Sequence, residues 1–373
     1  MAKGDRVAEH TIGTRIKALR RERGLSQDAL ADLFGFKDRQ TVSAIENGVR
    51  RVTASELLLA VEKLDVSLDY FTDPFRLDGE ALFSWRQTGV GQLELTDYER
   101  TAGQWVGAYR TLAAQVGRRT PLMRHALGLT KQSSFEDAMH AGERFVEEFE
   151  LGSVPAQALS AVMQDRLGIL VLLVDAHKGI SGAACRLPEF DAVLIARGEV
   201  EGRRNFDLAH ELFHILTWEA MPPKHVEDII DFGGNRVEQL ANNFAATVLM
   251  PRTTLEPFGE WSQLTTDRLV TRLNAKADEL GVTSSALRWR LVALKELTAV
   301  EARAIPEAAL RNNGHEDRSE PPALFSQTFA EVVAMAIDQG CLSVRRAARL
   351  IGLPIEDLEE LFAIHGIDAT LDL

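Results

Sequence analysis

The sequence has few cysteines, no long apolar run and no overall excess of basic residues. Only two cysteines occur in 373 residues, which excludes a framework of disulfides. No segment approaches the roughly 18 consecutive apolar residues that a membrane helix needs. The N-terminal MAKGDRVAEH contains no apolar segment of the kind found in secretory signals. We therefore expect a cytoplasmic protein that does not contact a membrane.

Charge is distributed unevenly along the chain. The formal net charge is −13, which argues against a protein that coats nucleic acid with its whole surface. Between Thr11 and Val52, however, nine Lys/Arg face five Asp/Glu, whereas the rest of the chain carries 33 basic and 50 acidic residues. A basic head on an acidic body favours one module that faces nucleic acid, joined to a body with another role.

The head has the layout of a helix-turn-helix. Ser26 is a good N-cap for a helix over residues 27–34, and a second helix is expected over 39–47. Arg39, Gln40 and Ser43 share one face of the second helix. Arg and Gln read guanine and adenine edges bidentately, so we expect this face to contact bases in double-stranded DNA. The residues expected to contact phosphates are Gln27, Asn47, Arg50 and Arg51.

Three motifs in this head, SQDALAD, SAIENG and VSLDYF, resemble the XRE family of phage-repressor-like regulators. The resemblance covers residues 11–72. It implies a five-helix, lambda-repressor-like domain in residues 1–75 that binds an operator as a homodimer, with half-sites about one helical turn apart. The stretch FGFKDRQTV is one residue longer than the usual family pattern.

The sharpest chemical signal is the segment NFDLAHELFHIL. His210 and His214 are four residues apart, which places both imidazoles on one face of a helix, within reach of one metal ion. Glu211 lies about 100° around that helix, where it could deprotonate a metal-bound water. Asp207, one turn earlier, could support a histidine. The spacing predicts a catalytic zinc site with Glu211 as general base.

Catalytic zinc needs a third protein ligand. The extended metzincin pattern is absent, because Thr217 and Ala220 occupy its glycine and histidine positions. The next predicted helix offers Glu238, with Asn242 on the same face to orient it. The connecting loop holds competing candidates, and these are His225, Glu227, Asp228 and Asp231.

HELFHIL followed by VEQLANNFAATVLMP resembles the ImmA/IrrE family of zinc metallopeptidases over about residues 150–255. The resemblance implies Glu238 as the third zinc ligand and a specific endopeptidase that cleaves a protein partner, such as a repressor or toxin, or itself. It also implies a role in a stress, phage or mobile-element response. Family members frequently carry an XRE head on the same chain.

Three further hypotheses concern the regions before and after the helix that carries His210 and His214. An extended peptide substrate would lie against an edge strand, and the region Ile180 to Ala196 is the expected edge. His225 is a candidate to stabilise the oxyanion. Cys185 falls in the same region, where a thiolate could occupy the open zinc position and keep the enzyme latent. The alternative for Cys185 is a small buried residue in a strand.

The expected fold is multidomain and mainly α. Residues 76–150 form a helical connecting region, 151–305 a central α+β zincin-like metallopeptidase domain with a small sheet, and 306–323 a linker. Residues 324–373 read as helix, Gly-Leu-Pro turn, helix. Four acids on the second of these helices disfavour DNA contact, so we expect a docking or dimerisation region.

The sequence is compatible with two functions. The first is a DNA-binding transcriptional regulator with a zinc-dependent endopeptidase domain. The second is a DNA-binding repressor or antitoxin whose zinc domain is structural or sensory. The presence of Glu211 beside His210 and His214 favours the first, because a structural zinc site needs no general base.

Overall fold

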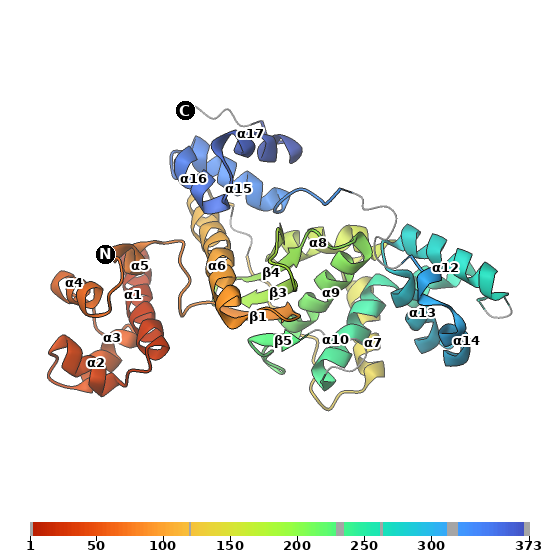
Figure 1. The fold of residues 1–373 in the computed structure, drawn as a ribbon, viewed down its shortest axis with the longest axis horizontal. Coiled ribbons are helices and arrows are strands. Elements are labelled where there is room, and N and C mark those ends of the chain that lie inside the picture. Colours follow the sequence, from red (N-terminus) through yellow and green to blue (C-terminus); the bar gives the residue numbers. More distant parts are fainter. Residues whose placement is uncertain (1–2, 119–120, 229–234, 262–263, 312–319, 369–373) are drawn as a thin grey trace.

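The computed structural model describes residues 3–118, 121–228, 235–261, 264–311 and 320–368, and these are mainly helical around one mixed sheet (Figure 1). No helix in these ranges is both long and apolar enough to cross a membrane. The expected fold class is therefore confirmed: a helical head, a central unit with a sheet, and a helical C-terminal region.

The head consists of five helices, and capping residues in the sequence mark the starts and ends of several of them. Ser26 accepts a hydrogen bond from Ala29 N, and Gly35 ends the same helix with φ of 67°, a conformation that glycine adopts without strain. Thr53 and Glu56 form a capping box. The helices are α1 (Lys3–Glu22), α2 (Gln27–Phe34), α3 (Arg39–Glu46), α4 (Ala54–Lys63) and α5 (Leu68–Thr72). Their apolar faces share one small core.

The sheet has five strands in the order β2-β4-β3-β1-β5. β4 pairs parallel with β2 and antiparallel with β3, while β1 pairs antiparallel with β3 and parallel with β5. The strands are β1 (Leu82–Gln87), β2 (Ile169–Val174), β3 (Ile180–Arg186), β4 (Asp191–Ala196) and β5 (Val226–Asp228). The expectation that residues 180–196 form the edge is wrong, because β3 and β4 are interior strands and β2 and β5 are the edges.

One face of the sheet is covered by α9 (Glu201–Thr217), which contacts β3 and β4. α10 (Arg236–Leu249) packs on α9, and α7 (Phe135–Phe149) packs on α10. The remaining elements around this core are α8 (Pro155–Asp165), α11 (Arg252–Leu255), η1 (Glu256–Phe258), α12 (Thr266–Leu280), α13 (Ser284–Ala293), α14 (Ala299–Ala304) and η2 (Glu307–Ala309).

The opposite face is covered by α6 (Gln92–Gln115). The C-terminal helices α15 (Gln327–Asp338), α16 (Val344–Ile351) and α17 (Ile355–Ile364) pack on α6 and on one another (Figure 1). Trp105 Nε1 on α6 donates to Leu350 O at 3.1 Å. The C-terminal region therefore docks on its own chain. Part of the expected linker, 312–319, lies outside the described residues.

The expected connecting region, residues 76–150, is built into the body. β1 is a strand of the sheet, α6 covers one of its faces, and α7 packs on α10 on the other. Its helices are apparent in the sequence, whereas the pairing of β1 with β3 joins residues about a hundred positions apart and has no local signal.

Residues 73–80, which we call the strap, join the head to the body. Glu80 Oε2 accepts from Arg110 Nη1 on α6 at 2.7 Å, and Glu80 Oε1 is 3.7 Å from Arg15 Nη2 on α1. Arg15 is almost fully buried and also donates to Arg76 O at 2.6 Å. A Cβ added to Gly107 on α6 would lie 2.1 Å from Phe75 O, so only glycine lets the strap pass this close.

Candidate metal centre and helix-turn-helix head

Two packed helices bring the predicted metal ligands together. His210 and His214 lie on one face of α9, and α10 contributes Glu238 from its first turn. The side chain of Asn235 caps α10 by accepting from Val237 N and Glu238 N, which fixes the helix start beside the histidines. The geometry therefore depends on how α9 packs against α10.

The donor atoms of these three residues converge on one point. His210 Nε2 lies 3.1 Å from Glu238 Oε2 and 3.1 Å from His214 Nε2, and His214 Nε2 lies 3.3 Å from Glu238 Oε1. All three donors fall within 4.8 Å of one another. Within the described residues, this is the one group of three or more His, Cys, Asp or Glu side chains close enough to hold a metal.

Asn242 fixes the tautomer of His210. Its Oδ1 lies 3.0 Å from His210 Nδ1. Because an amide oxygen can only accept, Nδ1 carries the hydrogen and Nε2 keeps its lone pair toward the cluster. Asn242 thus holds His210 in the form that binds a metal.

Burial dominates the electrostatics of this centre. It lowers the pKa of His210 to about 3, with the positive charge of Arg86 acting in the same direction. Burial raises the pKa of Glu211 to about 7. Burial alone would raise the pKa of Glu238, but the imidazoles of His210 and His214 beside it outweigh burial and lower that pKa well below its usual range. A charged carboxylate thus faces two imidazole nitrogens.

This donor set fits a transition metal such as zinc. Two imidazole nitrogens and one carboxylate are the protein ligands of one class of catalytic zinc site. Glu238 Oε1 is buried with no hydrogen-bond partner in the described part of the chain, although its geometry aims it at the histidines. A buried oxygen without a partner has lost its hydration, which costs free energy unless a donor or a cation takes the place of the water. A metal ion bound here would do so.

The two competing ligand candidates whose side chains are described, His225 and Glu227, do not join the cluster. His225 Nε2 lies 2.6 Å from Glu99 Oε2 on α6, which covers the other face of the sheet, so His225 is not the oxyanion partner either. Glu227 accepts from Lys224 N and Asn235 Nδ2. The side chain of Asp228 and all of Asp231 lie outside the described residues.

The structure does not bring Cys185 to the centre. Cys185 is fully buried and packs in the cluster on the α6 side, whereas its neighbour Ala184 packs on the α9 side. Successive side chains of a strand point to opposite faces, so Cys185 points away from the histidines. Burial also raises the pKa of its thiol well above the usual value. The latch hypothesis is therefore withdrawn.

Asp207 is buried on α9 one turn before His210, but its partners among the described residues are arginines and not a histidine. Arg86 Nη1 on β1 donates to Asp207 Oδ1 at 2.8 Å, and Arg203 Nε lies 3.9 Å from Oδ2. Arg86 escaped the sequence analysis because 121 residues separate it from Asp207. No local pattern marks such a contact.

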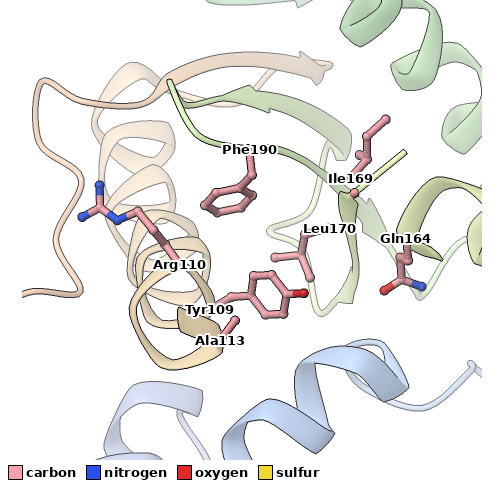
Figure 2. A pocket seen from close by; sticks show the side chains of 8 residues that line it. Tyr109, Arg110, Ala113, Gln164, Ile169, Leu170 and Phe190 are labelled. Carbon is pink, nitrogen blue, oxygen red and sulfur yellow. The ribbon is translucent and has the colours of Figure 1, made fainter. Parts of the chain in front are cut away.

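A small pocket lies away from this centre, between α6 and β2 (Figure 2). It is lined by Tyr109, Arg110, Ala113, Gln164, Gly168, Ile169, Leu170 and Phe190. A cavity of about 20 Å³ holds little more than one water molecule. It is too small for a peptide or an organic cofactor, so it does not compete with the metal centre.

In the head, α3 presents its N-terminal residues to the outside. Arg39 and Gln40 are exposed, and Ser43 is half-buried with its hydroxyl accepting from Asn47 Nδ2 at 3.3 Å. Asp38 caps α3 by accepting from Thr41 N. The start of α3 is therefore rigid as well as accessible.

The expected phosphate contacts differ in how they are held. Gln27 Nε2 donates to Glu46 Oε2 at 2.9 Å, and Arg50 makes two hydrogen bonds to Glu56, at 3.0 and 2.7 Å. Asn47 and Arg51 are exposed. Gln27, Arg50 and Asn47, which donates to Ser43, thus have partners within the head that position their side chains.

Comparison with known families gives the class of protein. Residues 16–71 match the family described as helix-turn-helix, and residues 164–291 match the M78 peptidase family, described as an IrrE N-terminal-like domain. The chain therefore combines an XRE-type helix-turn-helix domain with an IrrE N-terminal-like domain, as both resemblances implied.

A particular relative is the HTH-type transcriptional regulator PrpR of Mycobacterium tuberculosis (strain ATCC 25618 / H37Rv). The two are 27% identical over an alignment of 275 positions, which covers 64% of this chain and 56% of PrpR. The chain thus spans about half the length of this relative.

Two solved structures were also matched. Bacillus thuringiensis PlcR, in complex with the peptide PapR7 and DNA, is 12% identical, with 96% of this chain and 93% of that chain covered. The apo form of the competence regulator ComR from Streptococcus vestibularis is 10% identical, with 97% and 100% covered. The TM-score is 0.17 in both cases, so neither carries an argument about this chain.

Proposed function

We propose that this chain is a DNA-binding transcriptional regulator whose IrrE-like domain is a zinc-dependent endopeptidase that cleaves a protein partner or itself. The convergence of His210, His214 and Glu238 within 4.8 Å carries this proposal. The presence of Glu211 on the same helix supports proteolysis in particular, because it contributes nothing to the ligand set.

Each residue of the centre has a defined part in this scheme. His210, His214 and Glu238 would hold zinc, which when bound polarises a carbonyl and lowers the pKa of water. Glu211 would take the proton of the attacking water and pass it to the leaving amine. Asn242 and Asp207 hold the ligand helix and its imidazole in place.

The first experiment measures metal content and cleavage together. Elemental analysis of protein purified without chelator should find about one zinc per chain, lost or weakened in Glu238→Ala. Glu211→Gln should keep the zinc and abolish cleavage of the chain itself or of co-expressed candidate partners, detected by mass spectrometry. No zinc in well-folded wild type, or an active Gln variant, contradicts the scheme.

The head is proposed to bind operator DNA as a homodimer. Arg39 and Gln40 are exposed at the capped start of α3, the position from which recognition helices read bases. Arg39→Ala should weaken specific binding by roughly 10- to 100-fold. The control is Arg23, an exposed arginine directly after α1, and Arg23→Ala should change specific binding little. Fluorescence anisotropy at fixed salt measures both; equal losses would assign Arg39 to general attraction only.

A second candidate function is a repressor or antitoxin with a sensory or structural zinc domain. The near-complete burial of the centre favours it, since His210 and Glu211 are each 1% exposed and Glu238 is 9% exposed. A sensory or structural zinc site needs no access for a substrate carbonyl, and such burial limits that access. Wild type that holds zinc, and whose zinc level alters operator affinity without any cleavage, would select this function.

A further inference from the structure

Arg86 lies beside the metal centre because of the strand register. In the antiparallel pairing of β1 with β3, Arg86 is opposite Gly182. Directly opposed residues point to the same face of a sheet. A Cβ added to Gly182 would lie 3.7 Å from Glu211 Cγ, which shows that this face is the one covered by Glu211. The side chain of Arg86 therefore shares a face with the proposed general base.

Asp207 holds the guanidinium in place. Its carboxylate is 1% exposed and accepts from Arg86 Nη1 at 2.8 Å, and it precedes Glu211 by one helical turn. In the described part of the chain, Nη1 is the one guanidinium nitrogen of Arg86 with a hydrogen-bond partner, and the side chain keeps 14% of its surface exposed. Arg86 is thus anchored at one nitrogen, with donors left over.

The charge of Arg86 acts on the whole centre. Burial is the largest influence on the three neighbouring groups, lowering the pKa of His210 and raising those of Glu211 and Asp207, and the charge of Arg86 acts to lower all three. A fixed positive charge next to two histidines, which together with Glu238 form a metal-binding set, is unfavourable for cation binding. It is favourable for an anion that forms beside the cation.

We propose that Arg86 is the oxyanion-binding residue of the endopeptidase. The inference rests on the proposed function. When water attacks the scissile carbonyl carbon, a C–O bond forms, the carbonyl π pair moves to its oxygen, and the water proton passes to Glu211. The C–N bond then breaks as Glu211 returns the proton to the amine. Arg86 donates to the oxygen that carries the negative charge and keeps its own protons throughout.

The competing interpretation is that Arg86 only neutralises Asp207. Arg203 is the matched control, because it is also an arginine whose Nε lies 3.9 Å from the same carboxylate, but it projects from α9 itself. Arg86→Ala alone leaves the buried carboxylate of Asp207 without its hydrogen-bonded arginine, and an unpaired buried charge can prevent folding. The double variant Arg86→Ala/Asp207→Asn removes both charges and avoids that problem.

The test uses inorganic phosphate, a tetrahedral oxyanion, as the probe. Isothermal titration of zinc-loaded full-length chain with phosphate should give at least about a tenfold weaker affinity for the double variant than for Asp207→Asn alone, the loss expected for one charge-assisted pair. The phosphate affinity of Arg86→Lys should fall between those of wild type and the double variant, because lysine keeps the positive charge but lacks the forked pair of guanidinium donors. Arg203→Ala should bind phosphate as wild type does. Guanidinium chloride in the low millimolar range should restore part of the affinity of the double variant.

The outcomes separate this inference from the proposed function. Zinc content is measured on every variant first, and wild type without zinc overturns the proposed function. If zinc is bound equally but phosphate affinity is the same with and without Arg86, the role of Arg86 is overturned while the metal centre stands. Failure of wild type to bind phosphate, or an equal loss in Arg203→Ala, overturns it as well.

Discussion

At the scale of single residues, the contact between Asn242 and His210 offers a sharp test of the centre. Asn242→Ala removes the acceptor that keeps His210 Nδ1 protonated and Nε2 free. We expect zinc affinity to fall by 10- to 100-fold, the usual effect of removing such a support. Competition with a chromophoric chelator measures it.

The matched control for this prediction is the adjacent asparagine. Asn243 Nδ2 donates to Gln239 O within α10 and does not contact a histidine. Asn243→Ala should leave zinc affinity within about twofold of wild type. Equal losses in the two variants would mean that α10 is perturbed as a whole and that Asn242 has no special role.

Residue types and spacing predicted only those residues of the centre that lie close together in the sequence. His210, Glu211 and His214 follow from one helical turn, and Glu238 with Asn242 from another. Arg86 and Cys185 could not be placed, because the face on which a strand residue points depends on sheet register. A shift of one residue would exchange the faces of Ala184 and Cys185.

At the scale of elements, the contact between α7 and α10 supports the ligand Glu238. Gly142 on α7 lies against α10 so closely that an added Cβ would be 2.8 Å from Thr247 Cβ and 3.1 Å from Phe244 O. Gly142→Ala should therefore lower the free energy of unfolding by about 1–3 kcal/mol and weaken zinc binding as α10 shifts. Urea unfolding and zinc titration measure the two effects.

Gly198 provides the comparison for that substitution. An added Cβ at Gly198 would meet nothing within 4 Å, and its φ is outside the positive range. Gly198→Ala should leave stability within about 0.5 kcal/mol of wild type or raise it slightly. A stable Gly142→Ala variant with intact zinc binding would show that α7 and α10 can separate without affecting the centre.

Elements with local signals were predicted well, and the others were not. α2 and α3 begin at the expected residues, 27 and 39, because Ser26 and Asp38 cap them. β1 and β5 were missed as strands. β5 has three residues, and both strands are stabilised by pairing with distant segments, which a sequence window does not contain.

At the scale of the whole molecule, Glu80 ties the head to the body. It faces Arg15 of α1 and Arg110 of α6, and it is mostly buried. Glu80→Gln removes the charge that these two arginines share, so we expect a loss of about 1–3 kcal/mol in the free energy of unfolding. Hydrogen exchange within residues 73–80 should become faster.

Asp97→Asn is the control for Glu80. Asp97 pairs with Arg100 on the exposed side of α6, and such surface pairs contribute about 0–1 kcal/mol. The control should leave exchange in the strap unchanged. If Glu80→Gln also leaves it unchanged, the strap is held by its backbone contacts with α6, such as that of Phe75 O with Gly107.

The C-terminal helices illustrate what the sequence conveys at this scale. Their helicity and the acids of α17 were apparent, and docking was expected, but the sequence did not indicate the surface. The structure shows it to be α6 and the sheet behind it, where Phe325 N donates to Leu173 O at 2.7 Å. Arg346 on α16 also contacts the strap, 3.2 Å from Asp73.

The close passage of the strap over Gly107 has a consequence for geometry at long range. A tether of eight free residues would let the head sweep a wide volume and adapt to many spacings. Because the strap packs closely on α6, the head instead moves with the body as one rigid unit. In a pair of such chains, the distance and angle between the two α3 helices would be set by how the bodies meet. Any change in the shape of the body would then change the spacing of the two α3 helices, and with it the spacing of the half-sites that they can bind.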